Sequence, residues 1–218
     1  MKKRCLVLLS GEGYVEVASF QGSVSAYSFI QAHSLLTRAH VEVVAASVGG
    51  KTPKFHCETD EEQAWLDQHK DLVFADACEA SGNDFDALCV PSGVGAVTDL
   101  STNDRVGALV SAFASAKKPV CVIGFGVLAL AKAAVQARWA FEGYNVTAAS
   151  NAELARLPYF SKLDRLPEEL VLDLGGLFCA SQPDEVFICV DRTLISAQNP
   201  ASTTLAVLNL IWLCNAAK

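Results

Sequence analysis

The chain has 218 residues, of which 51% are hydrophobic and 19% are charged, and its formal net charge is −7. This length suits one well-packed domain over residues 1–218, and the acidic balance argues against autonomous binding to nucleic acid. The longest apolar stretch, Cys121 to Val135, contains two glycines and Lys132 and is too short to span a membrane. We therefore expect a soluble protein with no direct nucleic-acid contact and no direct membrane insertion.

Short apolar runs with strand character alternate along the chain with segments of helical periodicity. The predicted strands are Arg4–Ser10, Val41–Ala46, Ala87–Pro91, Val120–Ile123, Val186–Val190 and Leu194–Ala197. The predicted helices are Val24–Arg38, the segment that follows Thr59, Asp104–Ala116, and the segment that Asn199 caps and Pro200 begins. This alternation is typical of an α/β fold whose mostly parallel sheet is covered on both faces.

The segment Asn151–Phe178 has the least regular pattern. Pro158, Pro167 and the pair Gly175-Gly176 interrupt its apolar periodicity. We predict short helices and a hairpin there, packed on one edge of the domain.

Most of the eight cysteines lie inside apolar strand-like runs, where a thiol behaves as a small hydrophobic group. The sequence contains neither a C-x-x-C pair nor a cysteine–histidine spacing typical of zinc sites. We expect free thiols in a reducing cytoplasm, with no metal and no cofactor.

The run Pro119–Leu130 (PVCVIGFGVLAL) predicts a buried strand, a tight glycine turn and then an apolar helix. In α/β hydrolases such a unit holds a nucleophile on a strained elbow, beside backbone N–H groups that stabilise an oxyanion. The elbow position here is Gly124, which Phe125 and Gly126 follow. The sequence therefore predicts the frame of an active site without its nucleophile.

This elbow resembles the P-x-x-x-x-C-x-G elbow of class I glutamine amidotransferases and of the ThiJ/PfpI superfamily. Leu88–Ala96 (LCVPSGVGA) resembles that superfamily's strand ending in P-G-G-x-x-G, and Leu194–Leu213 resembles its closing strand and C-terminal helix. The resemblance covers nearly the whole chain and is strongest to one eukaryotic branch. It implies a flavodoxin-like three-layer sandwich.

The resemblance also implies that the catalytic machinery is lost. The superfamily's catalytic cysteine falls on Gly124, and its partner histidine would lie near Val146–Ser150, although no histidine follows His69. Glu12 and Glu16 are both candidates for the acidic residue that faces the cysteine. We predict a catalytically inactive protein with a vestigial elbow.

Two alternatives to a plain pseudoenzyme remain open. The first is a cysteine-dependent hydrolase, glyoxalase or deglycase with a relocated thiol, for which Cys121 and Cys89 are the candidates. The second is a small-anion site formed by Ser92, Gly93, Phe125 and Gly126 at the carboxyl ends of neighbouring strands. Phe125, together with Val127, could equally fill this pocket and close it.

The resemblance further implies partners and a location. It implies a homo-oligomer, dimeric or tetrameric, that works as an interaction or scaffold subunit. It also implies membership of the FERRY complex, a cytoplasmic early-endosome assembly that links messenger RNA to a small Rab GTPase. In that assembly, RNA contact would belong to other subunits rather than to this acidic chain.

Overall fold

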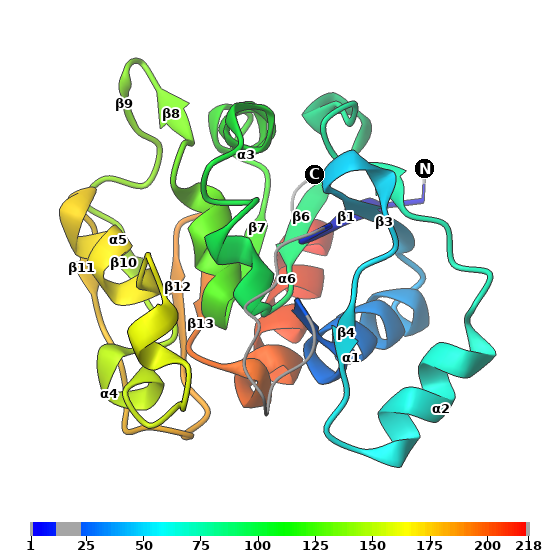
Figure 1. Cartoon of the computed structure of the whole chain (residues 1–218). Coiled ribbons are helices and arrows are strands. Elements are labelled where there is room, and N and C mark those ends of the chain that lie inside the picture. The colour runs from blue at the N-terminus through cyan, green and yellow to red at the C-terminus, as the bar shows by residue number, and fades with distance from the viewer. Residues whose placement is uncertain (1, 12–22, 217–218) are drawn as a thin grey trace.

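A seven-stranded sheet forms the middle layer of the structure, with helices on both faces (Figure 1). The computed structural model describes residues 2–11 and 23–216. The strand order is β12-β13-β7-β6-β1-β3-β5, and all neighbours are parallel except β12, which is antiparallel to β13. The strands are β1 (Arg4–Leu9), β3 (Glu42–Ser47), β5 (Ala75–Asp76), β6 (Ala87–Val90), β7 (Val120–Ile123), β12 (Ile188–Asp191) and β13 (Leu194–Ala197). This arrangement confirms the predicted α/β fold with its mostly parallel sheet.

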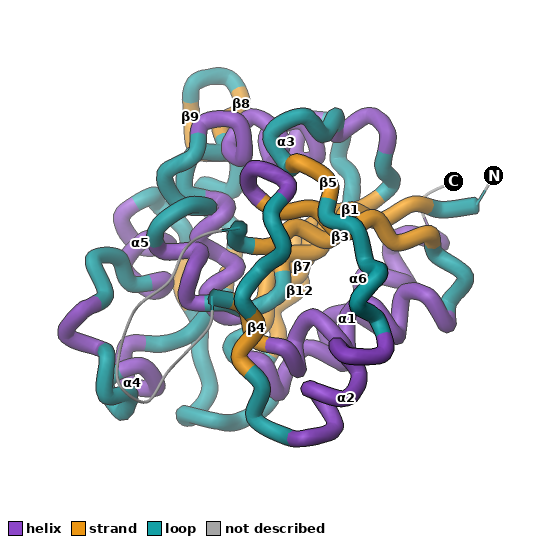
Figure 2. Tube along the Cα trace, turned by 45° about the vertical axis from the view of Figure 1, so that its right-hand side comes forward, coloured by secondary structure: helices purple, strands orange, loops and turns teal. Residues whose placement is uncertain are grey.

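The central strands are largely apolar because helices cover both faces of the sheet. Every residue of β6, β7 and β13 is buried. Figure 2 shows β1, β3 and β5 side by side at one end of this sheet. The strand Val120–Ile123 lies where the sequence predicted it.

One face of the sheet carries α1 (Ala26–Arg38), α2 (Asp60–Gln68) and α6 (Thr203–Ala216), and α6 lies beside α1 (Figure 1). The other face carries α3 (Asp104–Ser115), α4 (Asn151–Leu154) and α5 (Pro167–Asp173). The short 3₁₀ helices are η1 (Val48–Gly50), η2 (Gly82–Asp84), η3 (Val94–Val97), η4 (Gly124–Leu130), η5 (Phe160–Lys162) and η6 (Pro200–Ser202). In the part of the chain that the structure describes, no helix is both long and apolar enough to cross a bilayer.

Three two-stranded pairs complete the fold. β2 (Val24–Ser25) is parallel to β4 (Phe55–His56), and β10 (Asn145–Val146) is parallel to β11 (Leu177–Phe178). β8 (Ala134–Val135) and β9 (Arg138–Trp139) form an antiparallel hairpin. Because Val24 and Ser25 belong to β2, α1 begins two residues later than predicted.

Side-chain caps define where the helices begin. The Thr59 hydroxyl accepts a hydrogen bond from the Glu62 amide, and Asn103 Oδ1 accepts one from the Arg105 amide. Asn199 Oδ1 accepts from the Ser202 amide, and Pro200 follows as the first helical residue. The predicted helix starts at Thr59 and Asn199 are thus confirmed.

The helix predicted after the elbow is the seven-residue 3₁₀ helix η4, which ends at Leu130 as the predicted run does. There the chain turns away into the β8–β9 hairpin, and Trp139 Nε1 donates to the Leu130 carbonyl. One local prediction is wrong. The described part of Asn151–Phe178 contains short helices but no hairpin. α4 and α5 carry the chain back across the domain, so β11 returns parallel to β10.

Candidate functional site

The carboxyl ends of the central strands meet around a cavity of about 390 Å³. Ser92 follows β6 by two residues, Gly124 follows β7 directly, and Asn199 follows β13 by two residues. Parallel strands bring these loops to one edge of the sheet, where α/β proteins bind ligands. The lining residues are Ser25, His56, Glu58, Ser92, Gly93, Val94, Gly124, Phe125, Ala149, Glu153, Arg156, Leu157, Tyr159, Asp184, Asn199 and Pro200.

Gly124 has a backbone conformation that favours glycine, and Ser92 lies close to it. Its φ is +52°, a left-handed value that glycine adopts without the steric cost of a Cβ. A Cβ placed there would lie 2.5 Å from Ser92 Oγ and 3.2 Å from Ser92 Cβ. The Ser92 hydroxyl therefore occupies the space that a nucleophilic side chain would need.

Ser92 is held in this position by the start of α1. Its backbone N–H donates to Ser28 Oγ at 3.1 Å, and its carbonyl accepts from the Ser25 N–H at 2.9 Å. Ser28 Oγ is in turn 3.0 Å from Thr203 Oγ1 at the start of α6. These buried contacts tie the floor of the cavity to the two main helices of one face.

The structure brings together three of the four residues predicted for an anion site. Ser92, Gly93 and Phe125 line the cavity. Gly126 is not among the lining residues, and a Cβ there would lie 2.4 Å from the Val90 carbonyl oxygen, so this glycine serves close backbone packing. Phe125 and the fully buried Val127 pack into the core and do not close the cavity.

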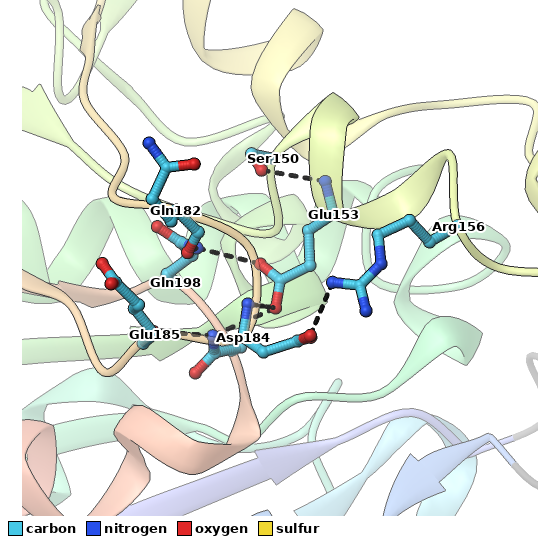
Figure 3. Close-up of polar contacts among 8 residues, drawn as sticks. Ser150, Glu153, Arg156, Gln182, Asp184, Glu185 and Gln198 are labelled. Atoms are coloured by element: carbon cyan, nitrogen blue, oxygen red, sulfur yellow. Dashed lines mark hydrogen bonds and ion pairs between the residues drawn. The ribbon is translucent and has the colours of Figure 1, made fainter.

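Glu153, which the sequence analysis did not single out, organises the opposite wall (Figure 3). Its carboxylate accepts hydrogen bonds from Gln198 Nε2 and Asn199 Nδ2, each at 3.0 Å, and from the Asp184 N–H at 3.3 Å. Its own amide donates to the Ser150 hydroxyl at the start of α4. One carboxylate thus joins α4, the loop after β11 and the end of β13.

One ion pair joins two of the charged residues that line the cavity. Arg156 Nη1 lies 2.5 Å from Asp184 Oδ2, and Figure 3 shows this pair beside Glu153. Both side chains are exposed, so the pair contributes little to stability. Arg156 is the one Lys or Arg among the described lining residues, which also include the carboxylates of Glu58, Glu153 and Asp184. An anionic ligand would therefore compete with Asp184 for it.

Among the described lining residues, His56 is the single histidine, and it enters from β4 rather than from the segment after the elbow. The parallel pairing of β2 with β4 places His56 opposite Ser25, and no local sequence signal indicates this pairing. Cys57 contacts Gln63 instead of the cavity. The candidate acids Glu12 and Glu16 lie outside the described residues.

The candidate relocated thiols lie away from the cavity, under α1 and α6. Cys89 and Cys121 are register partners on β6 and β7, and neither has exposed surface. A hydrogen bond with Cys89, burial and the neighbouring thiols raise the pKa of Cys121 well above its usual value. Because the thiolate is the nucleophile, this environment is that of an inert structural cysteine. Among the described residues, no group of histidine, cysteine and carboxylate side chains has the arrangement of a metal site.

Comparison with known proteins identifies the family. The DJ-1/PfpI family matches residues 17–207. "Glutamine amidotransferase-like class 1 domain-containing protein 1" of Homo sapiens is 34% identical over 218 residues, which covers 98% of this chain and 95% of the human protein. The protein of the same name from Danio rerio is 35% identical over 217 residues, covering 98% of both chains.

Solved structures share the fold at much lower identity. Rapid Encystment Protein 24 KDa of Francisella tularensis aligns with a TM-score of 0.89 and 16% identity, covering 97% of this chain and 99% of its own. Glyoxalase III of Candida albicans aligns with a TM-score of 0.85 and 14% identity, covering 97% of both chains. The fold is thus the flavodoxin-like sandwich that the resemblance implied. On the family match and the full-length relatives, the chain belongs to the DJ-1/PfpI family.

Proposed function

We propose that this chain is a catalytically inactive member of the DJ-1/PfpI family that serves as an interaction or scaffold subunit. The observation that carries the proposal is the pairing of Gly124 with Ser92, whose hydroxyl takes the space of the nucleophile's side chain. A vacant elbow could regain a nucleophile by one substitution. With Ser92 in its present position, a side chain at position 124 would also require the Ser92 hydroxyl to move.

The polar groups around the cavity support the same interpretation. A general base needs a lone pair aimed at the reacting group. The Glu153 carboxylate instead accepts hydrogen bonds from the side chains of Gln198 and Asn199 and from the Asp184 amide. This carboxylate therefore acts as a structural clasp for the wall of the cavity.

We also propose, from the resemblance to the eukaryotic branch, that the chain is a homo-oligomeric subunit of the FERRY complex. In that setting it would be cytoplasmic and associated with early endosomes through its partners, in an assembly that carries messenger RNA. The net charge of −7 fits a subunit that leaves RNA contact to others.

Affinity capture of the tagged chain from cells, followed by identification of the bound proteins, tests the scaffold role. We expect stable recovery of the subunits of an early-endosomal Rab effector complex. Recovery of no stable partner would contradict it.

Activity assays test the loss of catalysis separately. We expect no turnover of methylglyoxal or glutamine and no thiol that reacts quickly with iodoacetamide at neutral pH. Turnover that disappears in Cys121→Ser or Cys89→Ser would instead establish the cysteine-dependent hydrolase.

A small-anion sensor is the second candidate, and the cavity itself favours it. Ser92 and Arg156 both line a space of about 390 Å³, large enough for a small carboxylate or phosphate. Phosphate or acetate that binds there would raise the melting temperature, because a ligand of the native state stabilises it. A melting temperature unchanged at millimolar concentrations of either anion would rule this function out.

A further inference from the structure

The last helix, α6, is apolar on its outer face as well as on its inner face. Ala206, Val207 and Leu210 are fully buried against the sheet. On the opposite side, Leu205, Leu208 and Trp212 are 43%, 48% and 67% exposed. A helix that is hydrophobic all round is normally covered on all sides. The outer face of α6 is therefore an interface without its partner.

Exposed apolar surface is also found outside the helix. Val190 of the edge strand β12 is exposed and pairs with Ile195 of β13. Directly opposite residues of antiparallel strands point to the same side of a sheet. Ile195 belongs to the core under α6, so Val190 is a further exposed apolar residue on the face of the sheet that α6 covers. Exposed apolar patches mark interaction sites.

The patch is also electrically neutral. Residues 193–217 contain no Asp, Glu, Lys, Arg or His, although the whole chain carries a net charge of −7. Two copies of an acidic protein repel each other over most of their surface, and here they can meet without opposing like charges. The neutrality also disfavours a lipid surface, because helices that lie on membranes carry Lys and Arg on their polar face.

The exposed residues of α6 are spaced so that the same face of two copies could pair around a two-fold axis. Leu205 and Trp212 lie three residues before and four residues after Leu208, about 5 Å to either side of a point between Leu208 and Asn209. A two-fold axis through that point makes the two helices antiparallel. Leu205 of one copy then faces Trp212 of the other, as an isologous interface requires.

We propose that the outer face of α6, with Val190 at its margin, binds the same face of a second copy of this chain. This inference rests on the homo-oligomer of the proposed function and assigns it a surface. It is independent of the missing nucleophile and of the other subunits.

Sedimentation equilibrium of the purified chain over a range of concentrations tests the proposal, with Leu208→Glu as the disrupting variant. Two glutamates beside the two-fold axis would be buried without a counter-charge, so we expect the dissociation constant to rise at least about 100-fold. If the wild type is a tetramer, the same variant should leave a dimer. Leu172→Glu on α5 is the matched control, because Leu172 is also exposed but lies on the other face of the sheet.

Far-ultraviolet circular dichroism checks that Leu208→Glu remains folded. Leu208→Cys provides a second route, since a cysteine beside the two-fold axis should form a disulfide-linked dimer under mild oxidation. A monomeric wild type would overturn both this surface and the homo-oligomer, while leaving the FERRY proposal to the capture experiment. An oligomer that resists Leu208→Glu, or fails to cross-link through Leu208→Cys, would overturn the α6 surface alone.

Discussion

The cavity at Gly124 and the outer face of α6 differ in whether their side chains find partners within the chain. Around the cavity, Ser92 lies against the elbow and the Glu153 carboxylate has partners on two other segments. On α6, Leu208 and Trp212 are 48% and 67% exposed. The polar groups of the cavity thus find partners within one chain, whereas the outer face of α6 leaves large apolar side chains in solvent. This difference is what we expect of a scaffold subunit.

The largest effect that we predict is a difference in stability between substitutions on the inner and outer faces of α6. Leu210→Ala should lower the free energy of unfolding by about 2–5 kcal/mol, because it opens a cavity in the core. Leu208→Ala on the outer face should cost less than about 1 kcal/mol in the monomer, because that side chain is already half-exposed. Urea unfolding at a protein concentration low enough to dissociate the oligomer measures both free energies of unfolding. Equal costs would mean that the outer face already packs within one chain.

The next effect concerns the elbow. Gly124→Cys should cost about 2–4 kcal/mol, through the positive φ and through overpacking against Ser92. Gly143→Cys is the matched control, because Gly143 has a φ of +69° but its Cβ would meet nothing within 4 Å. The difference between the two unfolding free energies isolates the contact with Ser92.

Combining Gly124→Cys with Ser92→Gly should recover part of that loss without producing turnover of methylglyoxal. A cost for Gly124→Cys no larger than that for Gly143→Cys would show that the elbow still has room for a side chain. Efficient turnover by the double variant would contradict the proposed pseudoenzyme.

A smaller effect is expected at the wall of the cavity. Glu153→Gln replaces one acceptor oxygen by an amide that faces the donors of Gln198 and Asn199, and should cost about 1–3 kcal/mol. Glu142→Gln removes a carboxylate from an exposed ion pair with Arg138 and should change stability by less than about 1 kcal/mol. Thermal or urea unfolding of the two variants gives the comparison. Similar costs would refute the role of Glu153 as a clasp.

The smallest effect is a pH dependence that we expect for the free energy of unfolding but not for the dissociation constant of the oligomer. Burial and the nearby His69 lower the pKa of His33, so the folded state favours its neutral form. Below the unfolded pKa of about 6.5, the unfolded chain binds a proton on His33 that the folded chain does not yet bind. The free energy of unfolding should therefore decrease as the pH is lowered, until His33 also becomes protonated in the folded state.

The dissociation constant of the oligomer should stay constant over the same range, because the α6 face carries no group that titrates there. Burial raises the pKa of Cys214, on its inner side, to about 11. In His33→Phe the pH dependence of unfolding should weaken, and in the exposed control His40→Asn it should persist. An unchanged slope in His33→Phe would show that another group is responsible.

The amino-acid sequence predicted the frame of the site well. The strand Val120–Ile123, the glycine at the elbow and the cap at Asn199 all follow from local patterns of apolar and capping residues. The helix after the elbow ends at Leu130, as the predicted run does, but the hydrogen bond from Trp139, nine residues further on, to the Leu130 carbonyl was not predicted. Local periodicity contains no information about such a contact.

The fold class, the strand with its elbow and the glycine at the elbow position were determined by the sequence alone, because each follows from local patterns along the chain. Only the tertiary structure decided that Ser92 lies against the elbow, that His56 reaches the cavity and that Glu153 is a clasp. It also decided which side of α6 is left uncovered, since a helix apolar all round has no periodicity that separates its faces. These features join segments that are distant in sequence, and packing alone brings such segments together.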